Sequence, residues 1–191
     1  MIFHPLLVPT YLGAVLLWAP HSEAVYTVPA HRWPLLAVVW AGTFLLPAAG
    51  TYALVRTGRA SSLLLPDHRE RSGPLLLALA GFVVTAGVVR GAAPVLSWAL
   101  AGQATAVALT WLVSRHWLIS AHSVAMGGTV ALAMWLSRAA LTSGWWLVAG
   151  AAALAAAVGY SRLVLRAHTP AQVWAGLALG LAVGLGVAAV M

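Results

Sequence analysis

Long apolar blocks constrain the fold of this chain more than any other feature of its sequence. Runs of about 15 to 22 residues with few or no charged side chains recur along the 191 residues. A helix needs about 20 apolar residues to cross the roughly 30 Å hydrocarbon layer of a bilayer. Only 7% of the residues are charged, against about 25% in ordinary soluble domains. Lipid is therefore the expected solvent for most of the chain.

The blocks predict helices, because none of them alternates apolar and polar residues as barrel strands do. The expected class is all-α: one integral membrane domain over 1–191, a polytopic transmembrane bundle of about six to seven helices. The spans 75–89 and 94–113 are close enough to form a tight hairpin that turns at Arg90 to Pro94. The candidate spans are 5–19, 34–55, 75–89, 94–113, 122–138, 144–160 and 170–190.

Small residues recur at a helical spacing near the end of the chain. Gly176, Gly180 and Gly184 follow one another every four residues. This pattern lets membrane helices approach closely, so we expect a packing role for them. The ten Trp residues are expected to anchor the helices at the membrane interfaces.

Polar residues gather in three connecting segments, at 56–74, 114–122 and 161–172. The segments follow the second, fourth and sixth spans, so parity puts all three on one side of the membrane. This holds even if the third and fourth spans are both re-entrant. The segments hold seven of the ten Arg and four of the seven His: Arg56, Arg59, His68, Arg69, Arg71, Arg115, His116, His122, Arg162, Arg166 and His168.

Two explanations compete for this clustering. The positive-inside rule accounts for the arginines, because Arg-rich loops mark the cytoplasmic side. It does not account for the histidines, or for Ser120 beside His122. Ionisable groups at the membrane boundary are costly to keep, so their convergence favours a functional site.

The chemistry of these side chains suits phosphate. Guanidinium groups bind phosphate oxygens in pairs, and the helix N-termini expected near Ser120 and His168 offer N–H groups to anions. Two histidines beside such a pocket could divide phosphoryl transfer between a nucleophile and a proton donor, without a metal. Arginines would then stabilise the transferring group as divalent cations do in kinases.

The third polar segment resembles a motif of the type 2 phosphatidic acid phosphatase family, whose relatives include lipid phosphate phosphatases and vanadium haloperoxidases. That motif reads S-R, five residues, H, three residues, D. The chain has Ser161, Arg162, His168 and Gln172 at these positions, and only the last residue differs.

The family's other two motifs are matched less completely. The second, P-S-G-H, keeps its Ser and His in Ile119-Ser120-Ala121-His122. The first, K with six residues then R-P, is only loosely echoed between Arg59 and Pro74, where no Lys stands at the expected distance. The order of the three motifs agrees with the family.

The resemblance implies a role for each matching residue. His168 would be the nucleophile that forms a phosphohistidine, and His122 the general acid. Gln172 would stand where the family has the carboxylate that orients the nucleophile. The phosphate ligands would be Arg162, Ser120, Arg71 and, as an alternative to Arg71, Arg69.

Gln172 is the main departure from the family pattern. An amide oxygen accepts a hydrogen bond but supplies no charge. Replacing the Asp of a serine protease triad by an amide costs about 10⁴ in rate when the tautomer is lost. Activity could therefore be slow or absent, and a rival interpretation is a relative that binds or moves a phospholipid.

The sequence thus predicts a metal-independent phosphatase acting on a lipid phosphate or diphosphate, with its motif-bearing core at about 56–190. No cofactor, metal site or nucleic-acid partner is expected; the partners are a phosphorylated lipid and the bilayer. A transporter or channel subunit is a second rival, although no internal repeat supports it. A bacterial inner membrane and a cytoplasmic site are favoured by the absence of Lys and by the Arg distribution.

The remaining histidines match no motif. His116 and His68 are expected to be solvated loop residues. His4, His21 and His31 follow no pattern that indicates a role.

Overall fold

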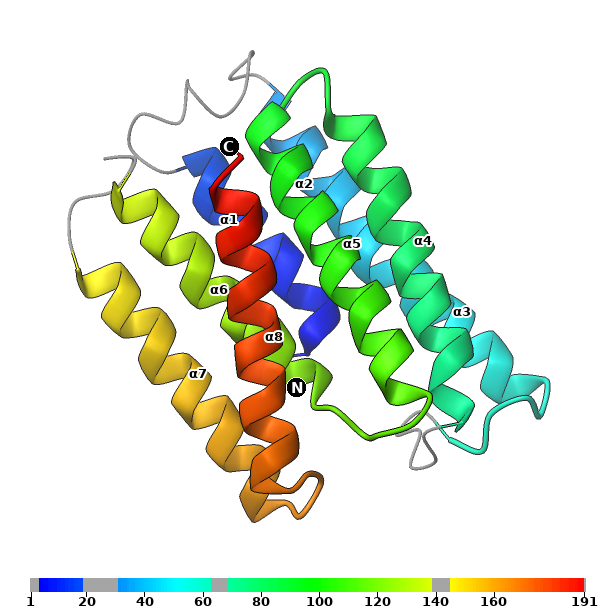
Figure 1. Ribbon diagram of the computed structural model, residues 1–191. Helices are drawn as coiled ribbons and strands as arrows, with labels where there is room; N and C mark the ends of the chain where they lie inside the picture. The colour runs from blue at the N-terminus through cyan, green and yellow to red at the C-terminus, as the bar shows by residue number, and fades with distance from the viewer. Residues whose placement is uncertain (1–3, 19–30, 63–68, 139–144, 191) are drawn as a thin grey trace.

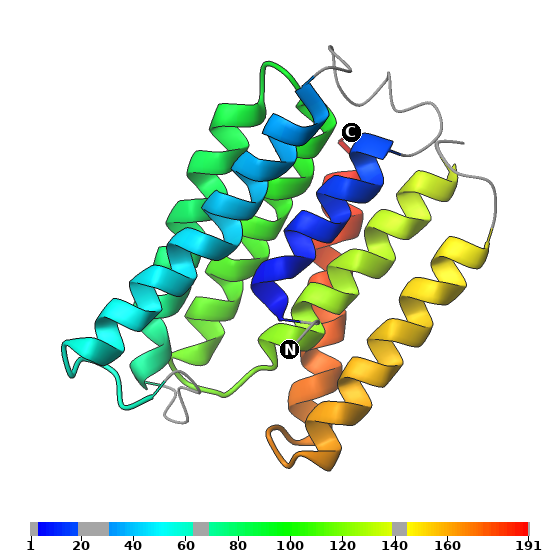
Figure 2. The ribbon, with the colours of Figure 1, turned by 180° about the vertical axis from the view of Figure 1, so that it is seen from behind.

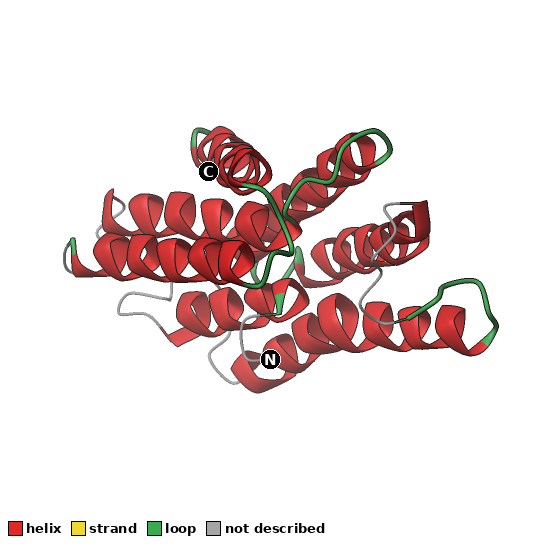
Figure 3. Ribbon diagram, turned by 90° about the horizontal axis from the view of Figure 1, so that it is seen from below, coloured by secondary structure: helices red, strands yellow, loops and turns green. Residues whose placement is uncertain are grey.

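A computed structural model describes residues 4–18, 31–62, 69–138 and 145–190. Every regular element among them is a helix, as the view from below shows (Figure 3). In chain order the helices are η1 (Pro5–Leu7), α1 (Val8–Trp18), α2 (Arg32–Trp40), η4 (Ala41–Leu45), α3 (Leu46–Arg56), η5 (Arg69–Arg71), α4 (Ser72–Val89), α5 (Pro94–Ser114), α6 (Ala121–Arg138), α7 (Trp146–Val164) and α8 (Pro170–Ala188).

Each of the seven predicted spans corresponds to a helical segment, which confirms the all-α bundle. Five segments are long and apolar enough to cross a membrane: 32–56, α4, α5, α7 and α8. The segment before Trp18 is shorter and apolar. α4 and α5 run antiparallel along the bundle and turn at 90–93, as the hairpin prediction requires (Figure 1).

The helices α2, η4 and α3 form one continuous rod with a π-helical turn in its middle. The π turn spans Ala41–Leu45 and ends just before Pro47. Proline has no N–H and its ring crowds the carbonyl one turn earlier, so a wider turn accommodates it without ending the helix. The predicted span at 34–55 is therefore one helix despite its internal proline.

The helices form two groups with α1 between them (Figures 1 and 2). α2, α3, α4 and α5 form one group, and α6, α7 and α8 form the other. The buried side chains of Leu16 and Leu17 join α1 to the core of the first group. Val8 packs with Met126 of α6 and Ala155 of α7 in the second group. The start of α1 therefore lies where the two groups meet.

The predicted packing role of the glycines in α8 is confirmed. A Cβ atom at Gly176 would lie 2.7 Å from the carbonyl oxygen of Ser120, and one at Gly180 would meet the carbonyl oxygen of Val124. One at Gly184 would meet the Cβ of Ala131. α8 therefore lies directly against the backbone of α6, which carries part of the predicted site.

Gly180→Ala should destabilise the protein, because the new methyl group meets a backbone carbonyl that has no rotamer to change. Overpacking of this kind costs about 1–3 kcal/mol, which corresponds to a fall of roughly 3 to 10 °C in melting temperature. Melting in detergent measures it. Gly186→Ala in the same helix is the control, because nothing lies within 4 Å of a Cβ there. Equal melting temperatures for the two variants would contradict the close contact.

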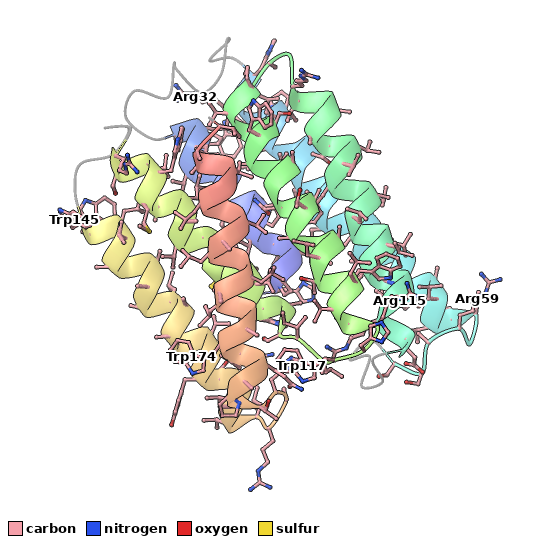
Figure 4. The ribbon with its side chains drawn as sticks, in the orientation of Figure 1. Arg32, Arg59, Arg115, Trp117, Trp145 and Trp174 are labelled. Atoms are coloured by element: carbon pink, nitrogen blue, oxygen red, sulfur yellow. The ribbon has the colours of Figure 1, made fainter. Side chains whose placement is uncertain are left out.

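The described parts of the three polar connections lie at one end of the bundle, as parity predicted (Figures 1 and 4). Arg59 and Arg115 mark this end, and Arg32 marks the opposite one. Trp side chains lie at both ends, with Trp145 at one and Trp174 at the other. Both of these Trp residues are exposed, as interface anchors should be.

Candidate active site

The connection from α7 to α8 folds back over the end of α7. Arg166 adopts a left-handed backbone with φ of 51°, which is the conformation that commonly ends a helix. The N–H groups of Ala167 and His168 then both donate to the carbonyl oxygen of Arg162, at 3.0 and 3.4 Å. The chain therefore reverses its direction within the five residues between Arg162 and His168. This reversal brings the two residues together.

Gln172 and Thr169 cap the start of α8 reciprocally. The N–H of Gln172 donates to Oγ1 of Thr169 at 3.4 Å, and the N–H of Thr169 donates to Oε1 of Gln172 at 3.0 Å. Because a backbone N–H only donates, the amide atom that receives it must be the oxygen. The orientation of the Gln172 amide is therefore fixed by the helix cap.

The same oxygen of Gln172 lies 3.2 Å from Nδ1 of His168. An oxygen acceptor at this distance favours the tautomer that carries its proton on Nδ1, in which Nε2 has the free lone pair. An amide thus selects the tautomer that the family's carboxylate is expected to select. A loss of this tautomer therefore does not follow from the presence of Gln in place of Asp.

His168 is favoured in its neutral form. Burial lowers the pKa of His168 from its ordinary value, and hydrogen bonds with the Gln172 side chain and the backbone of Leu118 oppose part of this effect. Nearby Arg71 and Arg162 lower the pKa further, because their charges repel an imidazolium. A neutral ring is the form in which Nε2 acts as a nucleophile.

Gln172→Glu should raise the pKa of His168. A carboxylate in place of the amide stabilises the imidazolium, and an opposite charge at such a distance shifts a pKa by about 1–3 units. NMR titration of the imidazole signals in detergent measures this. An unchanged pKa of His168 would mean that Gln172 does not contact Nδ1.

Ser120 is fully buried and caps α6. Its Oγ accepts hydrogen bonds from the N–H of Ser123 at 3.3 Å and from the hydroxyl of Ser123 at 2.9 Å. With both lone pairs occupied, its own O–H proton is left to donate. The N–H of Ser120 donates to the carbonyl oxygen of Gln172 at 3.3 Å, which joins the starts of α6 and α8 directly.

His122 lies in the first turn of α6, in a positive electrostatic environment. It interacts electrostatically with Arg162, His4, His168 and Arg71. Arg71 precedes α4, and burial lowers the pKa of this guanidinium. Three connections distant in sequence therefore bring their basic groups to one place.

The charges of this cluster suit an anion. Glu70 is the one carboxylate in the part of the chain that the structure describes, and it binds the N–H and the hydroxyl of Ser61. No group of three side chains suited to a metal ion occurs within those same residues. The cluster thus offers cationic side chains and helix N-termini, with no described carboxylate directed at it.

The structure adds one residue that the sequence patterns missed. His4 precedes η1, and its ring lies 6.2 Å from that of His122, measured between ring centroids. Nothing in the spacing of the motifs indicates this contact, because 117 residues separate His4 from His122. The side chain of Arg69 and the whole of His68 and His21 lie outside the described residues.

An apolar cavity of about 130 Å³ begins beside the cluster. Its lining includes the residues next to the two neighbouring histidines, Pro5 and Ala121, and Leu75 in the first turn of α4. It continues along α6 as far as Trp135, a distance of about 21 Å at 1.5 Å per helical residue. Gln103 and Thr110 are the polar residues among its lining.

Comparison with known proteins gives one match. The family model described as the PAP2 superfamily matches residues 73–191, which is more than half of the chain and includes the second and third motifs. No curated protein and no solved structure matches the chain. Together with its long apolar helices, the match makes the chain an integral membrane protein with a phosphatase-type function. The chain belongs to the PAP2 superfamily.

Proposed function

We propose that this protein hydrolyses the phosphate monoester or diphosphate of a lipid through a phosphohistidine on His168, without a metal ion. The arrangement of His168 and Gln172 carries the proposal, because the amide oxygen at Nδ1 favours the neutral tautomer in which Nε2 is unprotonated. Arg71, Arg162 and the hydroxyl of Ser120 would bind the phosphate oxygens. This end of the protein would face the cytoplasm under the positive-inside rule.

In the first step Nε2 of His168 attacks phosphorus. The bond from phosphorus to the lipid oxygen breaks and its electron pair stays on that oxygen, which receives a proton from His122. The product is a lipid alcohol, or a lipid monophosphate when the substrate is a diphosphate. The phosphate charge favours protonated His122, since it offsets Arg71 and Arg162.

In the second step water attacks the phosphohistidine. Neutral His122 accepts a proton from the water, the bond from phosphorus to Nε2 breaks, and its electron pair returns to His168. Inorganic phosphate leaves, and both histidines are back in their starting states. The arginines stabilise the transferring group in both steps.

The apolar cavity supports a lipid as the substrate. It begins beside Leu75 and Ala121, close to the basic cluster, and follows α6 into the bundle. A phosphate bound at the cluster would therefore have its hydrocarbon chain in an apolar surrounding. A water-soluble phosphate ester would use only the polar part of the site.

The test is phosphate release by purified protein in detergent with EDTA, using long-chain and short-chain lipid phosphates. We expect EDTA-resistant turnover and a lower KM for the long chain. Ala106→Leu narrows the cavity, so it should raise KM for the long-chain substrate and leave the short-chain one unchanged. Ala152→Leu, on the exposed face of α7, is the matched control.

The absence of turnover in a folded protein that still binds vanadate would overturn the proposal. It would favour a relative that binds or moves a phospholipid, for which the replacement of the expected carboxylate by Gln172 is the supporting observation. If Ala106→Leu changed KM equally for the long-chain and short-chain substrates, the cavity would not be the binding site of the hydrocarbon chain.

A further inference from the structure

His4 belongs to the part of the chain before the family match, yet it lies in the basic cluster. Its ring is edge-to-face with that of His122, with an interplanar angle of 70°, and edge-to-face with that of Phe44 in η4. The start of α1 lies beside the start of α6 in views from both sides (Figures 1 and 2). Two residues distant in sequence thus hold the ring between them.

The backbone also fixes the ring of His4. Its Nδ1 accepts the N–H of Leu6 at 3.3 Å, so that His4 caps the first helical turn. The proton of the neutral ring is therefore on Nε2. Burial lowers the pKa of His4, with a smaller contribution from the positive charge at the start of the chain.

Neither histidine has an opposite charge beside it among the described residues. The groups that face His122 are Arg162 from α7, His4, His168 before α8, and Arg71 before α4. A proton on one ring opposes a proton on the other, because both charges would share one partly buried, already positive site. Two histidines in this relation titrate as a pair rather than independently.

We propose that His4 is a positioning residue for His122, which holds the ring of the general acid at the phosphate site and competes with it for a proton. The inference rests on the proposed function, since it assigns His122 the proton transfer to the leaving group. The segment from His4 to Val8 thereby becomes part of the active site, and Pro5, Leu6 and Val8 also line the apolar cavity.

His4→Asn tests this inference, because Asn keeps an acceptor for the N–H of Leu6 and removes the titrating ring. We expect the NMR titration of His122 to shift upward by roughly one pH unit, because the repulsion from His4 is lost while that from His168 remains. The alkaline limb of the kcat profile should move upward with it. His31→Asn, at the first turn of α2 on the opposite end, should leave both measurements unchanged.

The outcomes separate this inference from the proposed function. Full rescue by Asn, with the titration of His122 and the kcat profile as in the wild type, would reduce His4 to a helix cap and overturn the inference. His4→Ala, which also loses the cap, should differ from His4→Asn in stability but share its pH profile. Without any wild-type turnover the proposed function fails, while the NMR titration still tests the coupling of the two rings.

Discussion

His168→Ala should abolish phosphate release, with a fall in kcat of at least about 10⁴-fold. The expected loss is this large because no other described side chain has both an unprotonated ring nitrogen fixed by Gln172 and a place among the arginines. The loss should be the same for a lipid phosphate and for nitrophenyl phosphate, since both need the attack on phosphorus. Steady-state phosphate release measures it.

His116→Ala is the matched control. His116 is an exposed histidine in the connection before α6, and its removal should leave the rate unchanged. Residual activity above about one hundredth of the wild-type rate in His168→Ala would show that another group attacks phosphorus. Melting temperatures of both variants in detergent establish that the loss is chemical.

The fold was predictable from sequence because lipid imposes simple requirements on a chain. Continuous apolar length predicted the seven membrane helical segments, and parity predicted which connections lie on the same side of the membrane. The observed helix boundaries differ from the predicted ones where capping and turn residues determine the helix end. α7 continues to Val164, four residues beyond the prediction, because Ser161 and Arg162 remain helical until Arg166 reverses the chain. The π turn before Pro47 has no signature in apolar length.

The site was predictable only as far as motif spacing extends. The spacing of Arg162, His168 and Gln172 reflects a local reversal and a helix cap, which are properties of neighbouring residues. The contact of His4 with His122 depends on how two distant helices pack, so no local pattern contains it. The sequence indicated that the amide of Gln172 can accept a hydrogen bond, but not that the N–H of Thr169 fixes which amide atom faces the ring.

His122→Ala should separate the two chemical steps. With a lipid phosphate, kcat should fall by about 10²–10⁴-fold, because an alkoxide leaving group then departs without a proton. With nitrophenyl phosphate the first step should remain fast, since nitrophenolate departs as a stable anion. Dephosphorylation still needs a base for water, so a burst of one nitrophenolate per site should precede a slow steady state. Stopped-flow absorbance measures the burst.

A burst would indicate that His122 transfers protons to and from oxygen atoms, whereas His168 attacks phosphorus. If His122→Ala lowered the rates for both substrates equally and gave no burst, His122 would bind phosphate rather than transfer protons. If added imidazole restored the steady-state rate of His122→Ala without changing the burst size, the missing group would be the base that activates water for attack on the phosphohistidine. The neighbouring Ser123 is a control, since Ser123→Ala removes one hydroxyl hydrogen bond to Ser120 but no titrating group and should give no burst.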